Sequence, residues 1–142
     1  MGLFDKFKSK GPEYAVLDQA SSAAQSLNSL KNPLESFAVQ VKDPLEIVPF
    51  ENTAFVFVGK PPKAFGLVWI QGGQVHNLKK VVAEKGIPAT TFQLISDDLR
   101  GAYERSGSVT RYSTILAGKN VVVTPSETLA REVHQIIQKL SI

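Results

Sequence analysis

Two strongly apolar runs near the middle of the chain constrain its fold more than any other feature. They occupy residues 54–58 (AFVFV) and 64–70 (AFGLVWI) and are separated by the five-residue connector GKPPK. A short connector rich in Gly and Pro between two β-forming runs is typical of a hairpin. Because consecutive residues in both runs are apolar, apolar side chains lie on both faces of these strands and both faces must be covered. We therefore expect the hairpin to form the centre of a sheet packed between helices.

The remaining pattern predicts helices and further strands around this hairpin. Apolar residues at three- and four-residue steps predict helices over 13–30, 75–85, 96–106 and 124–140, while extended segments are expected at 37–41, 45–50, 109–116 and 120–123. The last helix has the clearest start, with Thr124 as the cap, Pro125 at the first helical position and Glu127 three residues after the cap. Asp97 and Asp98 are expected in the first turn of a helix capped by Ser96.

This order predicts an α+β fold in which a mainly antiparallel sheet of about five strands packs with three to four helices. The order resembles that of small profilin-like or roadblock-like modules, where a five-stranded antiparallel sheet lies between helices. The resemblance rests on element order alone. We expect residues 1–12 to form an arm and residues 13–142 to form a single α+β domain of ordinary size.

Composition excludes several classes of protein. Hydrophobic residues make up 43% of the chain and charged residues 20%, which is enough apolar material for a packed core. The longest apolar runs are well short of the ~18 residues that a membrane span needs, so we expect a soluble, cytoplasmic protein without a transmembrane segment. The absence of cysteine excludes disulfides, thiolate zinc sites, iron–sulfur clusters and thiol nucleophiles.

The positive charge is concentrated at the start of the chain. The formal net charge is +3, and Lys6, Lys8 and Lys10 against Asp5 account for most of it. The rest of the chain is close to neutral and lacks the broad basic field of a nucleic-acid-binding protein. We expect no nucleic-acid partner.

The arm itself is amphipathic, because Leu3, Phe4 and Phe7 are interleaved with the lysines before a Gly-Pro break. Such a segment could contact a protein partner or, weakly, an anionic membrane surface. The alternative is a frayed terminus that the lysines keep in solution.

The junction around residues 70–80 is a candidate ligand site. Gly72 and Gly73 follow an apolar strand and precede His76, Lys79 and Lys80 on an expected helix. Backbone amides at a helix start, with glycines that allow close approach, can bind a phosphate or carboxylate. Neither a dinucleotide-binding glycine pattern nor a phosphate loop is present, and two glycines also suit a simple turn.

Titratable residues give no convincing catalytic or metal set. His76 would suit acid–base chemistry if it met Asp97, Asp98, Arg100 and Tyr103, but nothing in their spacing requires that. His134 falls beside the apolar stripe of the last helix, where a boundary residue is the simplest interpretation. We expect no catalytic residue, no metal site and no cofactor.

Two further surfaces could serve a protein partner or self-association. The connector Lys60-Pro61-Pro62-Lys63 would give a stiff, charged tip, although it would also protect the hairpin from edge association. The first helix has a middle of small residues at 20–24, which suits either a self-association seam or packing on the sheet.

These patterns leave two hypotheses for function. The leading hypothesis is a non-catalytic protein-interaction or assembly module, which uses the arm, the first helix or the tip at residues 60–63. The alternative is a small-ligand domain for a phosphate or carboxylate, possibly enzymatic, at the junction around residues 70–80.

Overall fold

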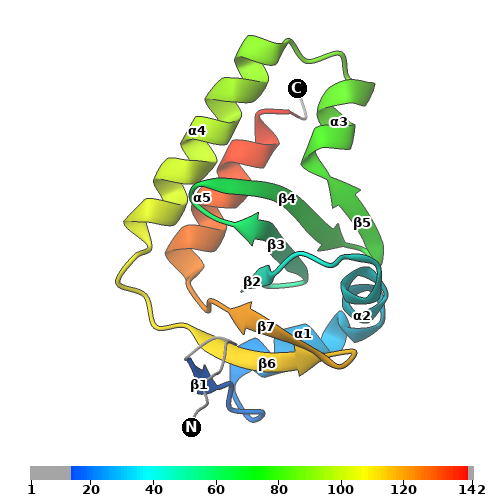
Figure 1. Cartoon of the computed structure of the whole chain (residues 1–142), viewed down its shortest axis with the longest axis vertical. Helices are drawn as coiled ribbons and strands as arrows, with labels where there is room; N and C mark the ends of the chain where they lie inside the picture. The colour runs from blue at the N-terminus through cyan, green and yellow to red at the C-terminus, as the bar shows by residue number, and fades with distance from the viewer. Residues whose placement is uncertain (1–13, 141–142) are drawn as a thin grey trace, which may run out of the picture.

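A computed structural model describes residues 14–140, which form an α+β fold with five helices and a seven-stranded mixed sheet (Figure 1). The helices are α1 (Ser22–Ser29), α2 (Lys31–Gln40), α3 (Leu78–Glu84), α4 (Ala89–Arg105) and α5 (Glu127–Gln138). The strands are β1 (Ala15–Val16), β2 (Leu45–Phe50), β3 (Thr53–Lys60), β4 (Ala64–Gln71), β5 (Gln74–Asn77), β6 (Tyr112–Leu116) and β7 (Lys119–Val123). None of these helices combines the length and hydropathy that crossing a membrane requires.

The strands lie in the order β1-β6-β7-β2-β3-β4-β5. Neighbours are antiparallel except for two pairs, because β1 runs parallel to β6 and β2 runs parallel to β7. The β3–β4 hairpin predicted from the two apolar runs is present, with Ala54 opposite Ile70 and Val58 opposite Gly66. The middle strand of the sheet is β2, so the prediction that this hairpin forms the centre was only partly right.

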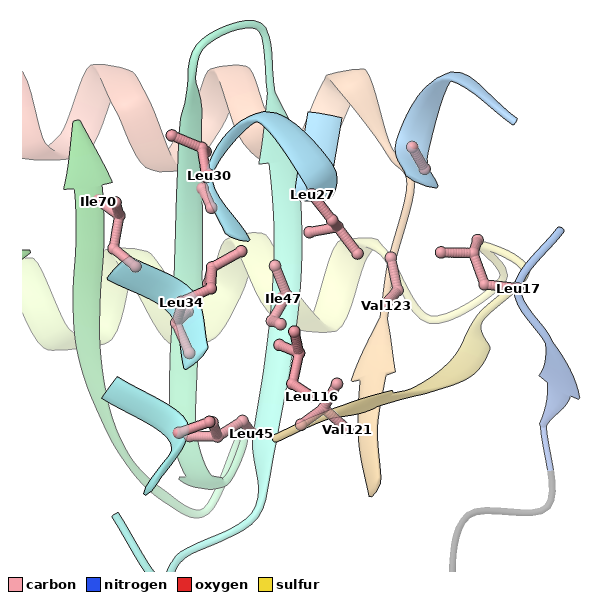
Figure 2. Packing of buried hydrophobic residues seen from close by; sticks show 14 of the residues in the cluster. Leu17, Leu27, Leu30, Leu34, Leu45, Ile47, Ile70, Leu116, Val121 and Val123 are labelled. Atoms are coloured by element: carbon pink, nitrogen blue, oxygen red, sulfur yellow. The ribbon is translucent and has the colours of Figure 1, made fainter. Parts of the chain in front are cut away.

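Helices α1 and α2 cover one face of the sheet (Figure 2). Leu27 and Leu34 point from the helices onto Ile47 of β2 and Val123 of β7, and all four side chains are buried. The small residues expected at the middle of the first helix belong to this layer, since Ala23 and Ala24 are buried in the same cluster. Their small size therefore has a packing explanation.

Helices α4 and α5, together with α3, cover the opposite face. Leu99 of α4 and Val133 of α5 are fully buried against Phe55 and Phe57 of β3. Burying large apolar side chains such as these stabilises the fold by roughly 1.5–3 kcal/mol each. The central strands are thus covered on both sides, as the sequence of the hairpin predicted.

The helix expected over 13–30 is confirmed only over Ser22–Ser29, and the strand expected over 37–41 was wrong. The chain forms β1, α1 and then α2, so residues 37–40 are helical. Pro33 does not stop the helix because it lies in the first turn of α2, where its missing N–H has no partner to lose. The residues of α2 that face the sheet are four apart, Leu34 and Ala38, whereas Val39 is 72% exposed.

Two helix starts were also placed wrongly. Helix α4 begins at Ala89 after Pro88, so Asp97 and Asp98 lie in its middle rather than facing its N-terminus. Helix α5 is capped by Ser126, whose Oγ accepts a hydrogen bond from the N–H of Leu129. Thr124 is fully buried and makes a different contact.

That contact belongs to a buried polar network around Glu46 of β2. One carboxylate oxygen, Oε2, accepts hydrogen bonds from Arg111 Nε at 2.8 Å and from Thr124 Oγ1 at 2.5 Å, while Oε1 accepts one from Tyr103 OH at 2.7 Å. Arg111 also donates from Nη2 to Ser106 Oγ at 2.9 Å, and its guanidinium lies 5.1 Å from the centre of the Tyr103 ring. The network joins β2, the end of α4, the start of β6 and the segment before α5.

The charges and hydroxyls of this network shift each other's protonation equilibria. Burial and the hydrogen bond to the Glu46 carboxylate raise the pKa of the Tyr103 phenol well above its usual value. Burial alone would lower the pKa of Arg111, but the hydrogen bond and negative charge of Glu46 outweigh burial and raise it. The phenol therefore stays a donor, and the guanidinium stays charged.

Replacing one member of the buried pair should unfold the protein more readily than breaking an exposed pair. We expect Arg111→Leu to lower the free energy of unfolding by about 3–5 kcal/mol, because Glu46 is left buried and uncompensated. Arg105→Leu removes an Arg–Glu contact in which the arginine side chain is 63% exposed, and we expect a loss below about 1 kcal/mol. Urea denaturation of both variants measures the difference, and equal losses would contradict it.

Candidate functional site

A cavity of about 400 Å³ lies between the α3, α5 and sheet layers, at the β3–β5 side of the sheet. It brings together both histidines of the chain and its single tryptophan, and we call it the His76–His134 pocket. Its volume is within the range of small-molecule sites. The described residues that line it are Thr53, Phe55, Trp69, Gln71, His76, Val81, Lys85, His134, Ile137, Gln138 and Leu140.

The floor of the pocket is built by sheet register. Phe55 of β3 lies opposite Trp69 of β4, and Trp69 lies opposite His76 of β5, so the three side chains form a row on one face. A second row next to it pairs Thr53 with Gln71. Since side chains alternate between faces every residue, both rows face α3 and α5.

The β4–β5 hairpin fixes this register. Gly72 and Gly73 have positive φ values of 61° and 78° and form a two-residue turn between the paired residues Gln71 and Gln74. Glycine readily adopts this left-handed conformation at both positions of such a turn. The chain then continues as a strand to Asn77, so the helix expected over 75–85 is present but begins only at Leu78.

Aromatic rings form two walls of the pocket. His76 stacks on Trp69 with ring centres 5.5 Å apart and planes 20° apart. On the opposite wall, His134 packs against Phe50 at 5.6 Å and against Phe55 at 6.2 Å. Trp69 is 8% exposed and both imidazoles are half-buried, so the rings form apolar walls and each imidazole keeps partial contact with solvent.

The rim carries positive charge. Lys85 follows α3 and is exposed, and its ammonium is the one permanent charge among the described residues that line the pocket. None of those lining residues is a carboxylate. With two imidazoles, two carboxamides and one hydroxyl beside the ammonium, the rim offers several hydrogen-bond donors to an anion.

The structure does not bring the five predicted ligand residues together. Gly72 and Gly73 are exposed at the hairpin turn, and His76 lies in the His76–His134 pocket. Lys80 is exposed on α3, and Lys79 lines a separate cavity of about 350 Å³ beside Phe37, Phe65 and Phe92. Asn77 caps α3 by accepting a hydrogen bond from the backbone N–H of Lys80 at 3.2 Å.

The other predicted sets are also dispersed. Asp97 accepts a hydrogen bond from Arg100, Asp98 pairs with Lys139, and Tyr103 joins the network around Glu46, so none of them meets His76. Among residues 14–140, no group of three or more His, Asp or Glu side chains is placed to hold a metal ion.

The predicted contact surfaces have different outcomes. The tip at Lys60, Pro61, Pro62 and Lys63 is tied to α4, because Arg100 Nε donates a hydrogen bond to Pro62 O at 2.7 Å. Its role as a contact surface remains a prediction. The residues predicted in the arm, Leu3, Phe4 and Phe7, lie outside the described part of the chain.

Sequence reasoning did not include Trp69, Lys85 and His134 in a site. His134 was interpreted as a boundary residue, and Trp69 belongs to one of the two apolar runs; neither description indicates that the two residues share a cavity. One signal was available: if Gly72-Gly73 is interpreted as a two-residue hairpin turn, Trp69 must lie opposite His76. The approach of α5 to that row had no signal in the sequence.

No protein-family model matches the chain, and searches of curated proteins and of solved structures find nothing significantly similar to it.

The stacking of His76 on Trp69 should be visible in the emission of the chain's single tryptophan. We expect His76→Ala to move the emission maximum to longer wavelength, because the indole loses the ring that shields it from water. His134→Ala is the matched control, since the His134 ring packs at a tilt against Phe50 and Phe55 and its loss should leave the indole shielded. Steady-state fluorescence measures both shifts, and an equal shift in the two variants would contradict the stacked arrangement.

Proposed function

We propose that the protein binds a small amphipathic anion, a flat apolar body carrying a carboxylate or phosphate group, in the His76–His134 pocket. The observation that carries this proposal is the composition of the pocket: aromatic walls with a cationic, donor-rich rim. This relocates the ligand-binding hypothesis from the glycine turn to the cavity that the turn helps to build. Only His76 belongs to both the sequence-based and the structure-based sites.

The chemistry of the rim favours an anion over a cation or a neutral ligand. An ammonium and donor side chains form charge-assisted hydrogen bonds to a carboxylate or phosphate oxygen. A cationic ligand would meet Lys85 and find no compensating carboxylate among the described lining residues. The stacked Trp69 and His76 rings offer an apolar surface for the body of the ligand.

The role is binding without catalysis. The pocket contains two imidazoles, but no described residue orients either of them as a carboxylate would orient a catalytic base. No hydroxyl in the pocket is hydrogen-bonded to a histidine in the described part of the chain, so no nucleophile–base pair is formed.

A titration with matched aromatic probes tests the proposal. We expect benzoate, indole-3-acetate and phenyl phosphate to change Trp69 fluorescence and raise the melting temperature, while benzamide and benzylamine bind at least several-fold more weakly. Lys85→Gln should weaken anion binding by about fivefold, the equivalent of about 1 kcal/mol for one charged hydrogen bond at an exposed rim. Lys80→Gln is the control, because Lys80 lies on α3 outside the pocket. Equal affinity for the anions and for benzylamine would contradict the proposal.

An interaction or assembly module is a second candidate function, favoured by a different observation. The face of β1, β6 and β7 opposite α1 and α2 is not covered by α4 or α5, because the cluster beneath those helices contains no residue of these three strands. Val16 is 76% exposed and Ile115 66% exposed on this face. Exposed apolar side chains grouped in this way mark interaction surfaces in many proteins.

Solution mass tests the second candidate. If the uncovered strands bind a second copy, light scattering should give a dimer for a chain beginning at Gly11, which keeps all of this face. Replacement of Ile115 by Glu should return that dimer to a monomer, whereas Val39→Glu, on an exposed position of α2, should not. A monomer at all concentrations would count against self-association.

A further inference from the structure

The uncovered strands form a defined apolar surface on one half of the sheet. In each strand the alternate residues Tyr112, Thr114 and Leu116, and Val121 and Val123, face α1 and α2. The intervening residues therefore face the other way. They form cross-strand rows, with Val16 beside Ser113 and Ser113 beside Val122, and with Ile115 beside Asn120. We call this surface the β6 face: Val16, Ser113, Ile115, Asn120 and Val122.

The β6 face ends where the described chain begins. Strand β1 is the edge of the sheet, and two hydrogen bonds hold it on β6: Leu17 N–H donates to Ser113 O at 2.8 Å, and Ser113 Oγ donates to Tyr14 O at 3.2 Å. The thirteen residues before Tyr14 are therefore tethered at the rim of this face. They include Leu3, Phe4 and Phe7, which a helix would place on one side because they are three and four residues apart.

We propose that residues 1–13 dock on the β6 face of their own chain, with Leu3, Phe4 and Phe7 against Ile115 and Val122. The inference goes beyond anion binding in the pocket. It also restricts the second candidate function, because a protein partner that binds the β6 face must first displace the arm.

The dimensions of the arm and of the face agree. Three strands spaced about 4.8 Å apart make a face about 10–15 Å wide. A helix over residues 3–10 would span about 12 Å at 1.5 Å per residue, and the residues between it and Tyr14 can bridge to the rim in extended form. Lysines at positions 6 and 8 would remain near water on the flanks of the apolar stripe.

Tethering favours this occupant over a separate molecule. A short flexible connection gives an effective concentration in the millimolar range, so an intramolecular contact forms with an intrinsic affinity too weak for a separate partner. A short helix that is marginal alone in water becomes stable when its apolar side is packed.

Cysteine pairs in the full chain test the docking, and the chain has no native cysteine to interfere. Lys6→Cys is combined with Ser113→Cys, which faces the proposed arm site, or with Thr114→Cys, which faces α1 and α2. These neighbours on β6 have the same tether and similar partial burial, and they present opposite faces. Ser113→Cys also removes the hydroxyl that donates to Tyr14 O, but the backbone hydrogen bond from Leu17 N–H to Ser113 O is kept and still holds β1 on β6. We expect a short bismaleimide to cross-link the Ser113 variant within one chain several-fold faster.

A second set of variants shows whether the apolar residues cause the preference. Replacing Leu3, Phe4 and Phe7 together by Ser should equalise the two rates and shift the methyl NMR signals of Val16, Ile115 and Val122. The signals of Val39, exposed on α2, should not move. Equal rates in the unmodified arm, cross-links mainly between two chains, or a preference that survives the triple replacement would each overturn the proposal. If phosphatidylserine vesicles abolish the faster cross-linking to position 113, the docking proposal holds and the membrane surface competes for the arm. If the arm binds vesicles but shows no preference for position 113 in their absence, the proposal is overturned.

Discussion

The buried contact between Arg111 and Glu46 is the constraint on which the arrangement of the two halves of the sheet depends. Glu46 lies on β2, at the point where the β2–β5 meander meets the β6–β7 hairpin through a parallel pairing of only a few residues. A charge at this position is stable only if it is fully paired, because an isolated buried carboxylate costs several kcal/mol. Arg111, Thr124 and Tyr103 satisfy both oxygens, and each comes from a different segment of the chain. The geometry of one carboxylate therefore fixes how α4 leaves the sheet, how β6 begins and where the segment before α5 runs.

The same fixed positions explain how the His76–His134 pocket is formed. Thr124 holds the entry to α5 at Glu46, so α5 crosses the sheet over β2 and β3 and brings His134 onto Phe55. The β4–β5 hairpin brings His76 to the same surface from the other side, by sheet register alone. The pocket is thus set by one long-range network and one local turn. A change in either would separate the two histidines without altering any residue that lines the cavity.

The parts of the fold and of the pocket that depend on residues close together in the chain could be predicted from the sequence. The parts that depend on contacts between distant segments could not. The β3–β4 hairpin, the strands β6 and β7 and helix α5 depend on local apolar periodicity and turn residues, and the sequence predicted them. Helix α2 was missed because Phe37, Val39 and Val41 also alternate as a strand does, and only contact with the sheet selects Leu34 and Ala38 as the buried pair. Thr124 had a strong local signal as a cap, but the buried carboxylate of Glu46 competes for its hydroxyl and Ser126 caps the helix. Strand β1 and the pairing of β2 with β7 join residues far apart in the chain, and no local pattern encodes them.

The two helical layers cover different widths of the sheet, and this difference separates the two proposed sites. Helices α1 and α2 pack on strands from β6 to β4, whereas α3, α4 and α5 pack on β2, β3 and β4. On the second side, the β4–β5 end is closed enough to form a pocket, and the β1–β6–β7 end is left open. Glu46 and its partners stand between them, as a rigid, fully paired boundary. Docking of the arm on the open end should therefore change the environment of Val16 and Ile115 and leave the His76–His134 pocket unchanged, because coupling between two sites needs an element with two discrete arrangements and the fully paired network around Glu46 has one.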